Sequence, residues 1–320
     1  MSTRPMRFAT QAGAAPSGQE WIDRAKRLEA LGYDTLAMPD HMIGGAWAAM
    51  SALAVAATVT QKLRVGTLVI DNDFRNPTVF ARECATLDVL TNGRFELGIG
   101  AGWLDRDYQS TGIAFDRGRV RVARLAEAVT LMKRLFTEEQ VTFAGEFYKV
   151  EKAESRPKTV QQPYPPFLIA GGGPDILALA GREADIVAIV PSGITGSGEI
   201  APEKFRLETM REQIGIVRDA AGARFDDIEL SMFLDCTLTD DREKTILELA
   251  EKAKVDPDVP RNNAYRGIGT LGEIRDHIVR LRDEIGITYF CLRGPDVEKL
   301  GPIVRELQGP RPVITSAPST

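Results

Sequence analysis

The sequence has few of the residues that usually build disulfide networks and metal centres. Cysteine occurs three times, at Cys84, Cys236 and Cys291, and no two cysteines share a C-x-x-C spacing. Only two histidines are present, His41 and His277. We therefore expect buried, reduced thiols rather than a disulfide framework or a Cys/His metal site.

Long apolar segments are also missing. No apolar run approaches the roughly 18 residues that suggest a membrane-spanning helix. The first residues, MSTRPMRFAT, lack the apolar core of a secretory signal. The net charge of −5 argues against nucleic acid or an anionic membrane as the main partner, whereas a small anionic ligand would depend on local charge. These observations predict a cytoplasmic protein whose partner is a small molecule.

Short apolar runs alternate with longer stretches of helical period along most of the 320 residues. Strands are expected at residues 7–12, 33–38, 63–70, 94–99, 167–170, 185–190, 228–234 and 287–292. Helices are expected at residues 20–30, 47–60, 77–90, 117–136, 174–184, 202–221, 241–254, 270–284 and 297–307. Right-handed parallel crossovers build either an open doubly wound sheet or a barrel, and eight strand–helix units favour the barrel. We therefore predict the α/β class and a (β/α)8 TIM barrel with insertions.

Three segments are predicted to lie outside the repeating units. Residues 141–150 are β-like and are expected to form a surface hairpin inserted in the barrel. The loop PSGITGSGE, at residues 191–199, is rich in glycine and serine, which predicts a mobile lid. Residues 309–320 are rich in proline, serine and threonine and are predicted to be a disordered tail, so that residues 1–308 form a single barrel domain.

In a (β/α)8 barrel the loops that follow the strands carry the functional residues. The second strand is followed by Asp40 and His41, a carboxylate and an imidazole that can polarise a bound ring or relay a proton. Adjacent residues of an extended chain point to opposite sides, so we expect one of the two to face the pocket. The alternative is structural, with Asp40 capping the next helix and His41 satisfied locally.

The loops after the third and fourth strands offer contacts to a flat ring. Residues 71–77 are typical of a turn and a helix cap, but the Asn72 amide can both donate to and accept from a heteroaromatic ring. The glycines of GIGAGW, at residues 98–103, let a flat ligand approach the backbone, and Trp103 stands where a dinucleotide fingerprint needs a third glycine. We expect Trp103 either to wall such a ring or to pack under residues 110–115.

Three consecutive glycines, Gly171, Gly172 and Gly173, lie between the fifth strand and a helix that begins with proline. Backbone N–H groups left exposed by small residues, together with a helix amino end, form an anion site whose natural ligand is phosphate. A tight turn without a ligand is the alternative. Pro191 and Ser192, after the sixth strand, would form the neighbouring wall.

Taken in order, these loops resemble the luciferase-like monooxygenase superfamily, and within it the branch that depends on coenzyme F420. The matching stretches are LEALGYDTLAMPDH, RVGTLVIDNDFRNP, LDVLTNGRFELGIGAGW and FLIAGGGPDILALAGREADIVAI. They cover most of residues 7–195, whereas the last third of the chain matches only in general layout. The resemblance implies an oxidoreductase that passes a hydride between coenzyme F420 and an organic substrate. It also implies a homodimer, which the second and third helices could form.

The resemblance implies a role for each loop. Asp40 and His41 would lie beside the deazaflavin ring, with His41 moving a proton or stabilising charge. A non-proline cis peptide would fall between Leu68 and Val69 and would press against the rear face of the ring. The residues expected to flank the ring or to hold its phosphate-bearing side chain are Ala101, Gly102, Trp103, Gly171, Gly172, Gly173, Pro191 and Ser192.

The chain also departs from its relatives. Sugar-phosphate dehydrogenases of the branch place an acidic group near the position of Trp103 and a basic cluster near the substrate phosphate. No such cluster can be placed in this sequence, so a phosphorylated sugar is not the expected substrate. Asp105, Arg106 and Asp107 could serve the pocket, but the expectation is that they are solvated loop charges.

Three other functions stay open. An FMN-dependent monooxygenase of the same fold would bind a ring of the same shape and a phosphate. A barrel for aldol or isomerase chemistry would need a lysine or acidic metal ligands at a strand end, and no lysine stands at any predicted strand end. A non-catalytic relative could bind a flavin without turnover.

Overall fold

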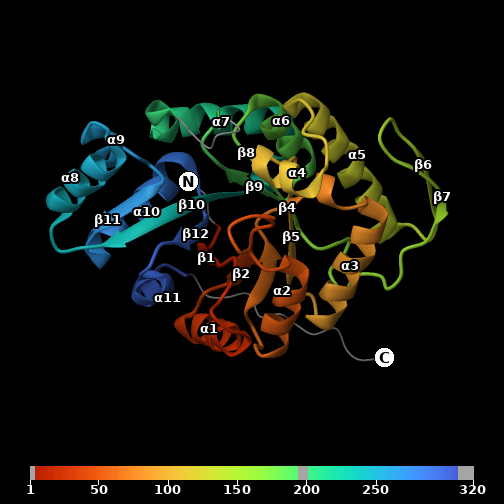
Figure 1. Ribbon diagram of the computed structural model, residues 1–320, viewed down its shortest axis with the longest axis horizontal. Coiled ribbons are helices and arrows are strands. Elements are labelled where there is room, and N and C mark those ends of the chain that lie inside the picture. The colour runs from red at the N-terminus through yellow and green to blue at the C-terminus, as the bar shows by residue number, and fades with distance from the viewer. Residues whose placement is uncertain (1–3, 194–200, 309–320) are drawn as a thin grey trace.

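The computed structural model describes residues 4–193 and 201–308, and within them a parallel sheet closes into a barrel (Figure 1). Its strands, in spatial order, are β10 (Glu229–Leu238), β12 (Tyr289–Arg293), β1 (Arg7–Gln11), β2 (Thr35–Met38), β3 (Arg64–Thr67) with β4 (Ile70–Asp71), β5 (Phe95–Gly100), β8 (Phe167–Gly171) and β9 (Ile186–Ile189). The pairing of β9 with β10 closes the ring. The predicted (β/α)8 barrel is therefore confirmed.

Helices surround the barrel, and several of them begin at a residue whose side chain caps the helix. The α-helices are α1 (Gly18–Leu31), α2 (Ala49–Thr58), α3 (Pro77–Leu90), α4 (Asp105–Thr111), α5 (Gly118–Thr137), α6 (Pro174–Glu183), α7 (Leu207–Ala221), α8 (Arg242–Ala253), α9 (Asp258–Arg261), α10 (Leu271–Ile285) and α11 (Gly301–Leu307). The 3-10 turns are η1 (Asn72–Phe74), η2 (Pro202–Phe205), η3 (Gly222–Asp227) and η4 (Val297–Leu300). The helices capped in this way are α1, α3, α8 and α10; Asn76 caps α3, and Thr270 with Glu273 forms a capping box on α10.

The predicted surface hairpin is confirmed. Strands β6 (Val141–Ala144) and β7 (Lys149–Ala153) pair antiparallel and belong to no other sheet. Figure 1 shows this hairpin projecting beside α5. The predicted lid overlaps residues 194–200, and the predicted tail is residues 309–320; both lie outside the described residues.

Three sequence predictions were wrong in detail. The third strand is not continuous over residues 63–70, because a cis peptide separates β3 from β4. The helix predicted at residues 202–221 is broken at Arg206, between η2 and α7. One strand–helix unit is not simple, since α8, α9 and an extra strand, β11 (Arg266–Gly269), precede α10. The segment RGIG of β11 has two glycines and one apolar residue, so it gives no strand signal.

Strand β10 is long enough to serve two parts of the sheet. Residues 229–232 pair with β9 and residues 231–235 pair with β12, which completes the barrel. Residues 235–238 continue past the barrel wall and pair with β11 instead. Figure 1 shows β10 running out of the barrel toward β11 and α10.

The core has two layers. Apolar side chains on the outer face of the strands pack against the helices, and this shell contains most of the large buried residues. The barrel interior is a separate and smaller cluster in which small side chains recur, including Ala9, Ala37, Ala188 and Cys291. Small interior residues leave volume near the mouth of a barrel that larger side chains would fill. All three cysteines are buried free thiols, as predicted.

Charged residues fill the amino-terminal end of the barrel. Glu96 is 3% exposed; it pairs with Arg7 and, at 2.7 Å, with Arg64, and it accepts the Tyr289 hydroxyl at 2.8 Å. Arg7 also pairs with Glu229 at 2.7 Å. Burial alone would raise the pKa of Glu96, but the two arginines outweigh it and the pKa is lowered. The floor of the barrel is therefore an ion-pair cluster.

Within residues 4–193 and 201–308, no helix is long and apolar enough to cross a bilayer.

Candidate active site

His41 follows β2, and a buried carboxylate orients its ring. Its Nδ1 lies 2.6 Å from Oδ2 of Asp107 on α4. The other oxygen of Asp107 accepts the backbone N–H groups of Met42 and Ile43 at 2.8 and 3.2 Å. Asp107 is 3% exposed, whereas the His41 side chain is 32% exposed. An ionised carboxylate only accepts hydrogen bonds, so Nδ1 carries the proton and Nε2 is available to accept or release one.

Asp107 corrects a sequence prediction. The charges at residues 105–107 were expected to be solvated, and this is wrong for Asp107 because α4 turns it inward against the His41 loop. Asp107 and Tyr108 are the two buried residues of α4, the short helix that follows the glycines. Burial of these two residues could have been predicted only if α4 itself had been predicted. The helix itself was not predicted.

Trp103 stands next to His41. The indole lies edge-on to the imidazole, with ring centroids 5.8 Å apart and an interplanar angle of 88°. Trp103 is 42% exposed, and the 110–115 loop covers a different group, since the Phe115 ring meets Tyr108 edge to face and lies under the Arg121 guanidinium. Packing of Trp103 under that loop is therefore not observed, and its role as the wall of a ring stays a prediction.

Asp40 is buried and fully engaged. It does not cap α2, whose N-cap is Ala48 without a side-chain hydrogen bond, so the predicted cap is wrong, although the contacts that Asp40 makes instead are structural. Its two carboxylate oxygens pair with the Arg75 guanidinium, with 2.9 Å between Nη2 and Oδ1. One of them also accepts the Asp71 backbone N–H at 3.2 Å. Asp40 thus joins the loop after β2 to the loop after β4, while His41 is the exposed member of the pair.

The peptide between Leu68 and Val69 is cis, as the resemblance implied. The neighbouring strand β5 accommodates this bend through two glycines. A Cβ on Gly98 would overlap the Thr67 carbonyl oxygen, and a Cβ on Gly100 would lie 2.9 Å from a Val69 methyl group. Gly98 and Gly100 are therefore needed to leave room for the bend at the cis peptide, in addition to any role in letting a ligand come close to the backbone.

The loop after β4 holds a hydrogen-bonded cluster of carboxylates. The Tyr108 hydroxyl lies 3.1 Å from Asp71 and 3.1 Å from Asp73. Asn72 is 3% exposed, and its amide donates to the Tyr148 hydroxyl at 3.0 Å. The Asn72 donor is therefore held by the β6–β7 hairpin, which corrects the expectation that it faces a ring. The turn and cap roles predicted for the rest of this loop are confirmed.

Asp71 gives this cluster a dependence on pH. Burial, and then the nearby Asp73 and Asp40, raise the pKa of Asp71 to about 6 from 3.8, although hydrogen bonds oppose the shift. A carboxyl whose pKa rises on folding destabilises the protein above that pKa, and the cost vanishes as pH falls toward 3.8. Asp71→Asn should therefore remove a stability gain of about 3 kcal/mol between pH 6 and pH 4. Urea unfolding across this range measures it, and equal slopes in both proteins would contradict it.

The three glycines after β8 form a tight turn against the end of β9. A Cβ on Gly172 would lie 2.5 Å from the Val190 carbonyl oxygen and 2.8 Å from that of Pro191. Gly173 is the N-cap of α6 and offers no side chain to its first N–H groups. Pro191 lies beside the turn, since its carbonyl oxygen would be 2.8 Å from a Cβ on Gly172, whereas the role of Ser192 stays a prediction. The result is an uncapped helix amino end next to close-packed backbone, which suits an anion.

Gln213 was not predicted from the sequence, although it supports the same turn. It lies on α7, is 3% exposed, and its amide donates to the carbonyl oxygens of Gly172 and Val190 at 2.9 and 2.8 Å. The available signal was its place beside Met210 and Ile214, on the inner face of the helix. Gln11 of β1 was missed too, and donates to the Leu68 carbonyl at 2.6 Å.

The predicted residues therefore lie on one arc of the barrel mouth. His41 follows β2, the cis peptide joins β3 and β4, Trp103 follows β5, the glycines follow β8 and Pro191 follows β9. These strands are successive neighbours in the sheet. The arc offers a hydrogen-bonded imidazole, an exposed indole and an anion cradle, which together can bind and protonate or deprotonate a planar, anionic ligand.

Comparisons with known proteins identify the family of this chain. A model of the luciferase-like monooxygenase family matches residues 3–284. The F420-dependent glucose-6-phosphate dehydrogenase of Intrasporangium calvum is 39% identical over 176 residues, 52% of each chain. The enzyme of that name from Nakamurella multipartita is 32% identical over 257 residues, 77% of this chain and 72% of the relative. The match thus spans about half the length of the first relative.

Among solved structures, the coenzyme F420 dependent tetrahydromethanopterin reductase from Methanopyrus kandleri is similar in fold. Its TM-score is 0.75 at 18% identity, and the alignment covers 95% of this chain and 99% of that one.

Proposed function

This chain belongs to the luciferase-like monooxygenase family, and from that premise we propose that it is an oxidoreductase that transfers a hydride between coenzyme F420 and an organic substrate. The observation that carries the proposal is the arc of the barrel mouth on which His41, Trp103, the Leu68–Val69 peptide and the glycine turn follow one another. The relatives named for F420 support the choice of cofactor.

The residues present fit such a cofactor. The barrel interior includes the small side chains Ala9, Ala37, Ala188 and Cys291. At the amino end of α6, a Cβ on Gly173 would meet nothing within 4 Å, so the space beside this helix end is open to a phosphate. The ring would lie against Leu68 and Val69, with Trp103 at its side. The phosphate-bearing side chain would be held by backbone groups of residues 171–173 and by Pro191 and Ser192. When bound, the deazaflavin supplies the hydride chemistry, and the protein supplies placement and electrostatics.

His41 and Asp107 form the proton-handling part of the site. Asp107 is anchored by two backbone N–H groups and holds Nδ1 of His41, so the imidazole keeps one orientation and one tautomer. Nε2 would then be free to exchange a proton with a bound substrate. Trp103 limits how far the imidazole can turn, because its edge contacts the ring.

Asp107 is a positioning residue, and its removal should affect turnover but not cofactor affinity. Charge-assisted hydrogen bonds contribute about 1.5–3 kcal/mol, so Asp107→Asn should lower kcat about 10- to 150-fold. Nitrogen NMR of His41 provides a second measurement, because the variant should show both neutral tautomers where the wild type shows one. A single unchanged tautomer would contradict the role.

Gly172 should be required for cofactor affinity. A methyl group there must displace the Val190 and Pro191 carbonyl oxygens, at 2.5 and 2.8 Å. Overpacking of this kind costs about 1–3 kcal/mol, so Gly172→Ala should weaken F420 binding about 5- to 150-fold. Gly18→Ala is the matched control, because a Cβ at Gly18 meets nothing within 4 Å. Equal F420 dissociation constants for the two variants would show that Gly172 does not contribute to the cofactor site.

Binding of the two ring cofactors tests the proposal as a whole. The purified apo-protein is titrated with coenzyme F420 and, separately, with FMN, and binding is followed by fluorescence. We expect saturable binding of F420 and none of FMN at the same concentrations. The reverse result would make the protein an FMN-dependent monooxygenase of the same family. F420 binding without turnover of any substrate would make it a non-catalytic relative.

The names of the relatives suggest which substrate to test first. Glucose 6-phosphate is the first compound to assay, because the curated relatives are named for it. The sequence predicts that glucose 6-phosphate is not the substrate, because Trp103 stands near the position where such enzymes place an acidic group. Loss of F420 absorbance is expected with other organic donors, and rapid reduction by glucose 6-phosphate would overturn that prediction.

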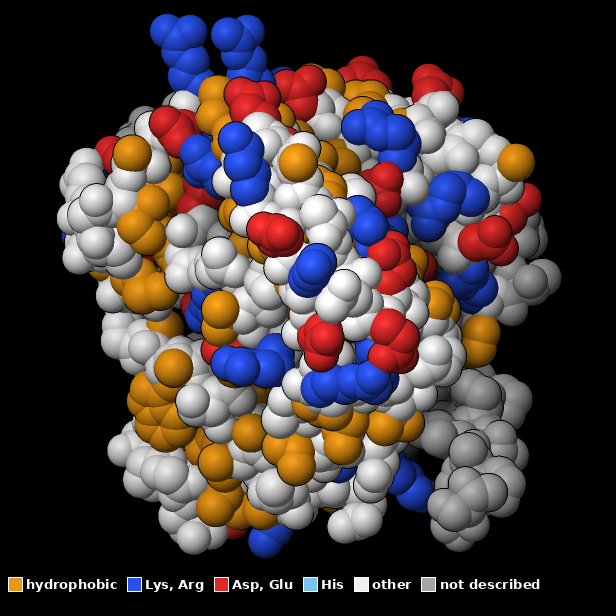
Figure 2. All heavy atoms as spheres, turned by 90° about the vertical axis from the view of Figure 1, so that its right-hand side faces the viewer, with side chains coloured by type: hydrophobic (Ala, Val, Ile, Leu, Met, Phe, Trp, Pro, Cys, Tyr) orange, Lys and Arg blue, Asp and Glu red, His pale blue; other side chains and the backbone are white. Residues whose placement is uncertain are grey.

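A homodimer through α2 and α3 belongs to the same proposal. These two helices carry exposed apolar side chains, namely Val55, Val79, Val89 and Leu90. Figure 2 shows hydrophobic side chains gathered on the lower part of its face, on the level at which α3 lies in Figure 1. Sedimentation equilibrium should give twice the 35.1 kDa chain mass, and Val79→Asp should shift it to the monomer. A cytoplasmic location stays a prediction from the sequence.

A further inference from the structure

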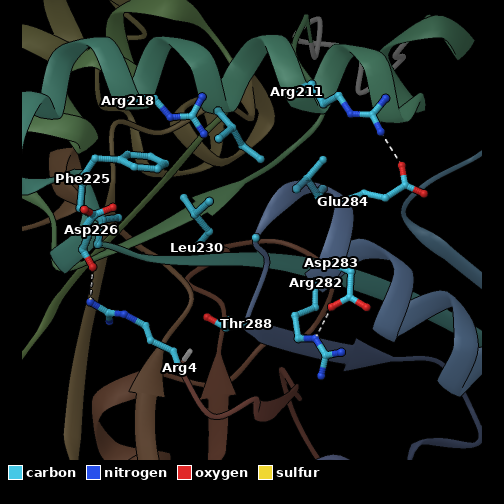
Figure 3. Close-up of a pocket in the computed structure, with 14 residues that line it drawn as sticks. Arg4, Arg211, Arg218, Phe225, Asp226, Leu230, Arg282, Asp283, Glu284 and Thr288 are labelled. Carbon is cyan, nitrogen blue, oxygen red and sulfur yellow. Dashed lines mark hydrogen bonds and ion pairs between the residues drawn. The ribbon is translucent and has the colours of Figure 1, made fainter. Parts of the chain in front are cut away.

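Two cavities lie between α7 and α10, on the side of the barrel where β10 runs out toward β11. The first, of about 690 Å³, is lined by the carboxyl-terminal parts of both helices. The second, of about 890 Å³, is lined by their amino-terminal parts and by β11. The ion pair between Arg211 of α7 and Glu284 of α10 spans the cleft between the two helices (Figure 3). Both cavities are rich in arginine, but the arginines are paired differently.

In the first cavity every arginine is engaged. Figure 3 shows its charged side chains, with the hydrogen bonds and ion pairs among them as dashed lines. The contacts are Arg211 with Glu284, Arg282 with Asp283 at 2.7 Å, Arg4 with the Asp226 carbonyl at 3.0 Å, and Arg218 over the Phe225 ring at 4.6 Å. Each arginine of this cavity therefore already has a protein partner.

The second cavity, which we call the arginine cavity, is not compensated in this way. Its basic residues are Arg206, Arg242, Arg261, Arg266, Arg280 and His277. Arg261 pairs with Glu243 and Asp258. The other arginines have no carboxylate within ion-pair distance among residues 4–193 and 201–308, and three of them, Arg206, Arg242 and Arg266, have no side-chain hydrogen bond there either.

The carboxylates that line the arginine cavity do not offset this excess. Glu273 is committed to the capping box, where it accepts the Thr270 backbone N–H at 2.8 Å. Asp276 pairs with the neighbouring Arg275 at 2.8 Å. Glu208 is an exposed residue in the first turn of α7. Guanidinium groups gathered from α7, α8, β11 and α10 repel one another unless an anion lies between them.

His277 shows the effect of this positive charge. Its Nε2 donates to the Ala264 carbonyl at 3.0 Å, and its Nδ1 accepts from Arg280 at 3.1 Å, which is the pattern of a neutral imidazole. Burial lowers the pKa of His277, and Arg280 and Arg242 lower it further, while the Ala264 contact opposes them. An anion bound beside these two arginines would weaken their effect on His277.

We propose that the arginine cavity binds a small molecule with at least two negative charges, of the phosphate type. The planar guanidinium group matches phosphate oxygens in pairs, and arginines that approach from several elements can hold more than one charged group. The volume suits a metabolite of ordinary size. The proposal does not depend on redox function, since the cavity lies between outer helices and shares no lining residue with the arc at the barrel mouth.

Inorganic pyrophosphate is the probe, titrated into the whole apo-protein at low ionic strength. Binding is followed through the His277 imidazole signals in NMR, which a His41→Ala background leaves as the sole histidine signals. We expect saturable binding and a higher pKa of His277 in the complex. Arg280 and Arg242 act on His277 directly, and the other charged groups that line the cavity with it are Arg206, Glu208, Arg261, Arg266, Glu273 and Asp276. Arg242→Gln and Arg266→Gln should each weaken binding at least about tenfold.

Two outcomes would overturn the proposal. One is the absence of any saturable change in the His277 signals. The other is equal pyrophosphate affinity in the wild type and in both arginine variants. Arg27→Gln, an exposed α1 arginine paired with Glu298 at 3.1 Å, is the matched control and should bind pyrophosphate like the wild type. Because Arg242 is an exposed side chain, its replacement leaves the fold intact and keeps the test valid.

Discussion

His41→Ala should lower kcat about 10²- to 10⁴-fold, the usual contribution of a positioned acid–base group. The dissociation constant for F420 should change little, because the glycine turn and the helix amino end that would hold the phosphate do not involve this side chain. Stopped-flow measurement of hydride transfer and a fluorescence titration of F420 together separate the two quantities.

Arg106→Ala is the control for this experiment. Arg106 is exposed on α4, next to Asp107, so its truncation changes the same surface without touching the imidazole. Unchanged turnover in His41→Ala would remove the proton-handling role while leaving F420 binding untouched. A parallel loss of affinity and turnover would instead make His41 a binding residue.

Glu96→Ala should cost about 3–5 kcal/mol of unfolding free energy, the largest effect on stability expected in this chain. The carboxylate is 3% exposed and holds Arg7, Arg64 and Tyr289 together at the floor of the barrel. Its loss leaves the Arg64 guanidinium without its carboxylate and Glu229 as the single acid on Arg7. Urea unfolding measures the difference.

Glu139→Ala is the matched control for Glu96→Ala. Glu139 also pairs with an arginine, Arg156, but both side chains are more than half exposed, at 74% and 62%. Exposed pairs contribute about 0–1 kcal/mol, so this variant should unfold close to the wild type. A similar loss of unfolding free energy in both variants would mean that burial does not determine how much the Glu96 ion pairs stabilise the protein.

Periodicity was sufficient to predict the barrel. Strands such as β8 and β9 are apolar along their whole length, as strands covered on both faces must be, and the helices between them keep a single apolar face. The extra strand β11 escaped because its residues form a short edge with two glycines. The break at Arg206 escaped because η2 and α7 share one continuous helical pattern.

Position in the chain was sufficient to place His41, Trp103 and the glycine turn, but not to assign their contacts. Asp107 reaches His41 across 66 residues, and Gln213 reaches Gly172 across 41, so neither contact leaves a local pattern. For Asn72 the sequence predicted a contact with a ring that the structure does not support. Its chemistry suited a ring, yet the β6–β7 hairpin occupies its donor through Tyr148. Side-chain partners remote in sequence are decided by the closed fold.

The charged floor also bears on kinetics. With Arg7, Glu96 and Glu229 filling the bottom, molecules enter and leave the barrel by the mouth alone. In the proposed site the deazaflavin would lie against Leu68 and Val69 with the substrate above it, so we expect the deazaflavin to bind first and leave last. Steady-state data should accordingly show an ordered mechanism, with the deazaflavin as leading reactant and final product, and with substrate analogues competing against substrate but not against cofactor.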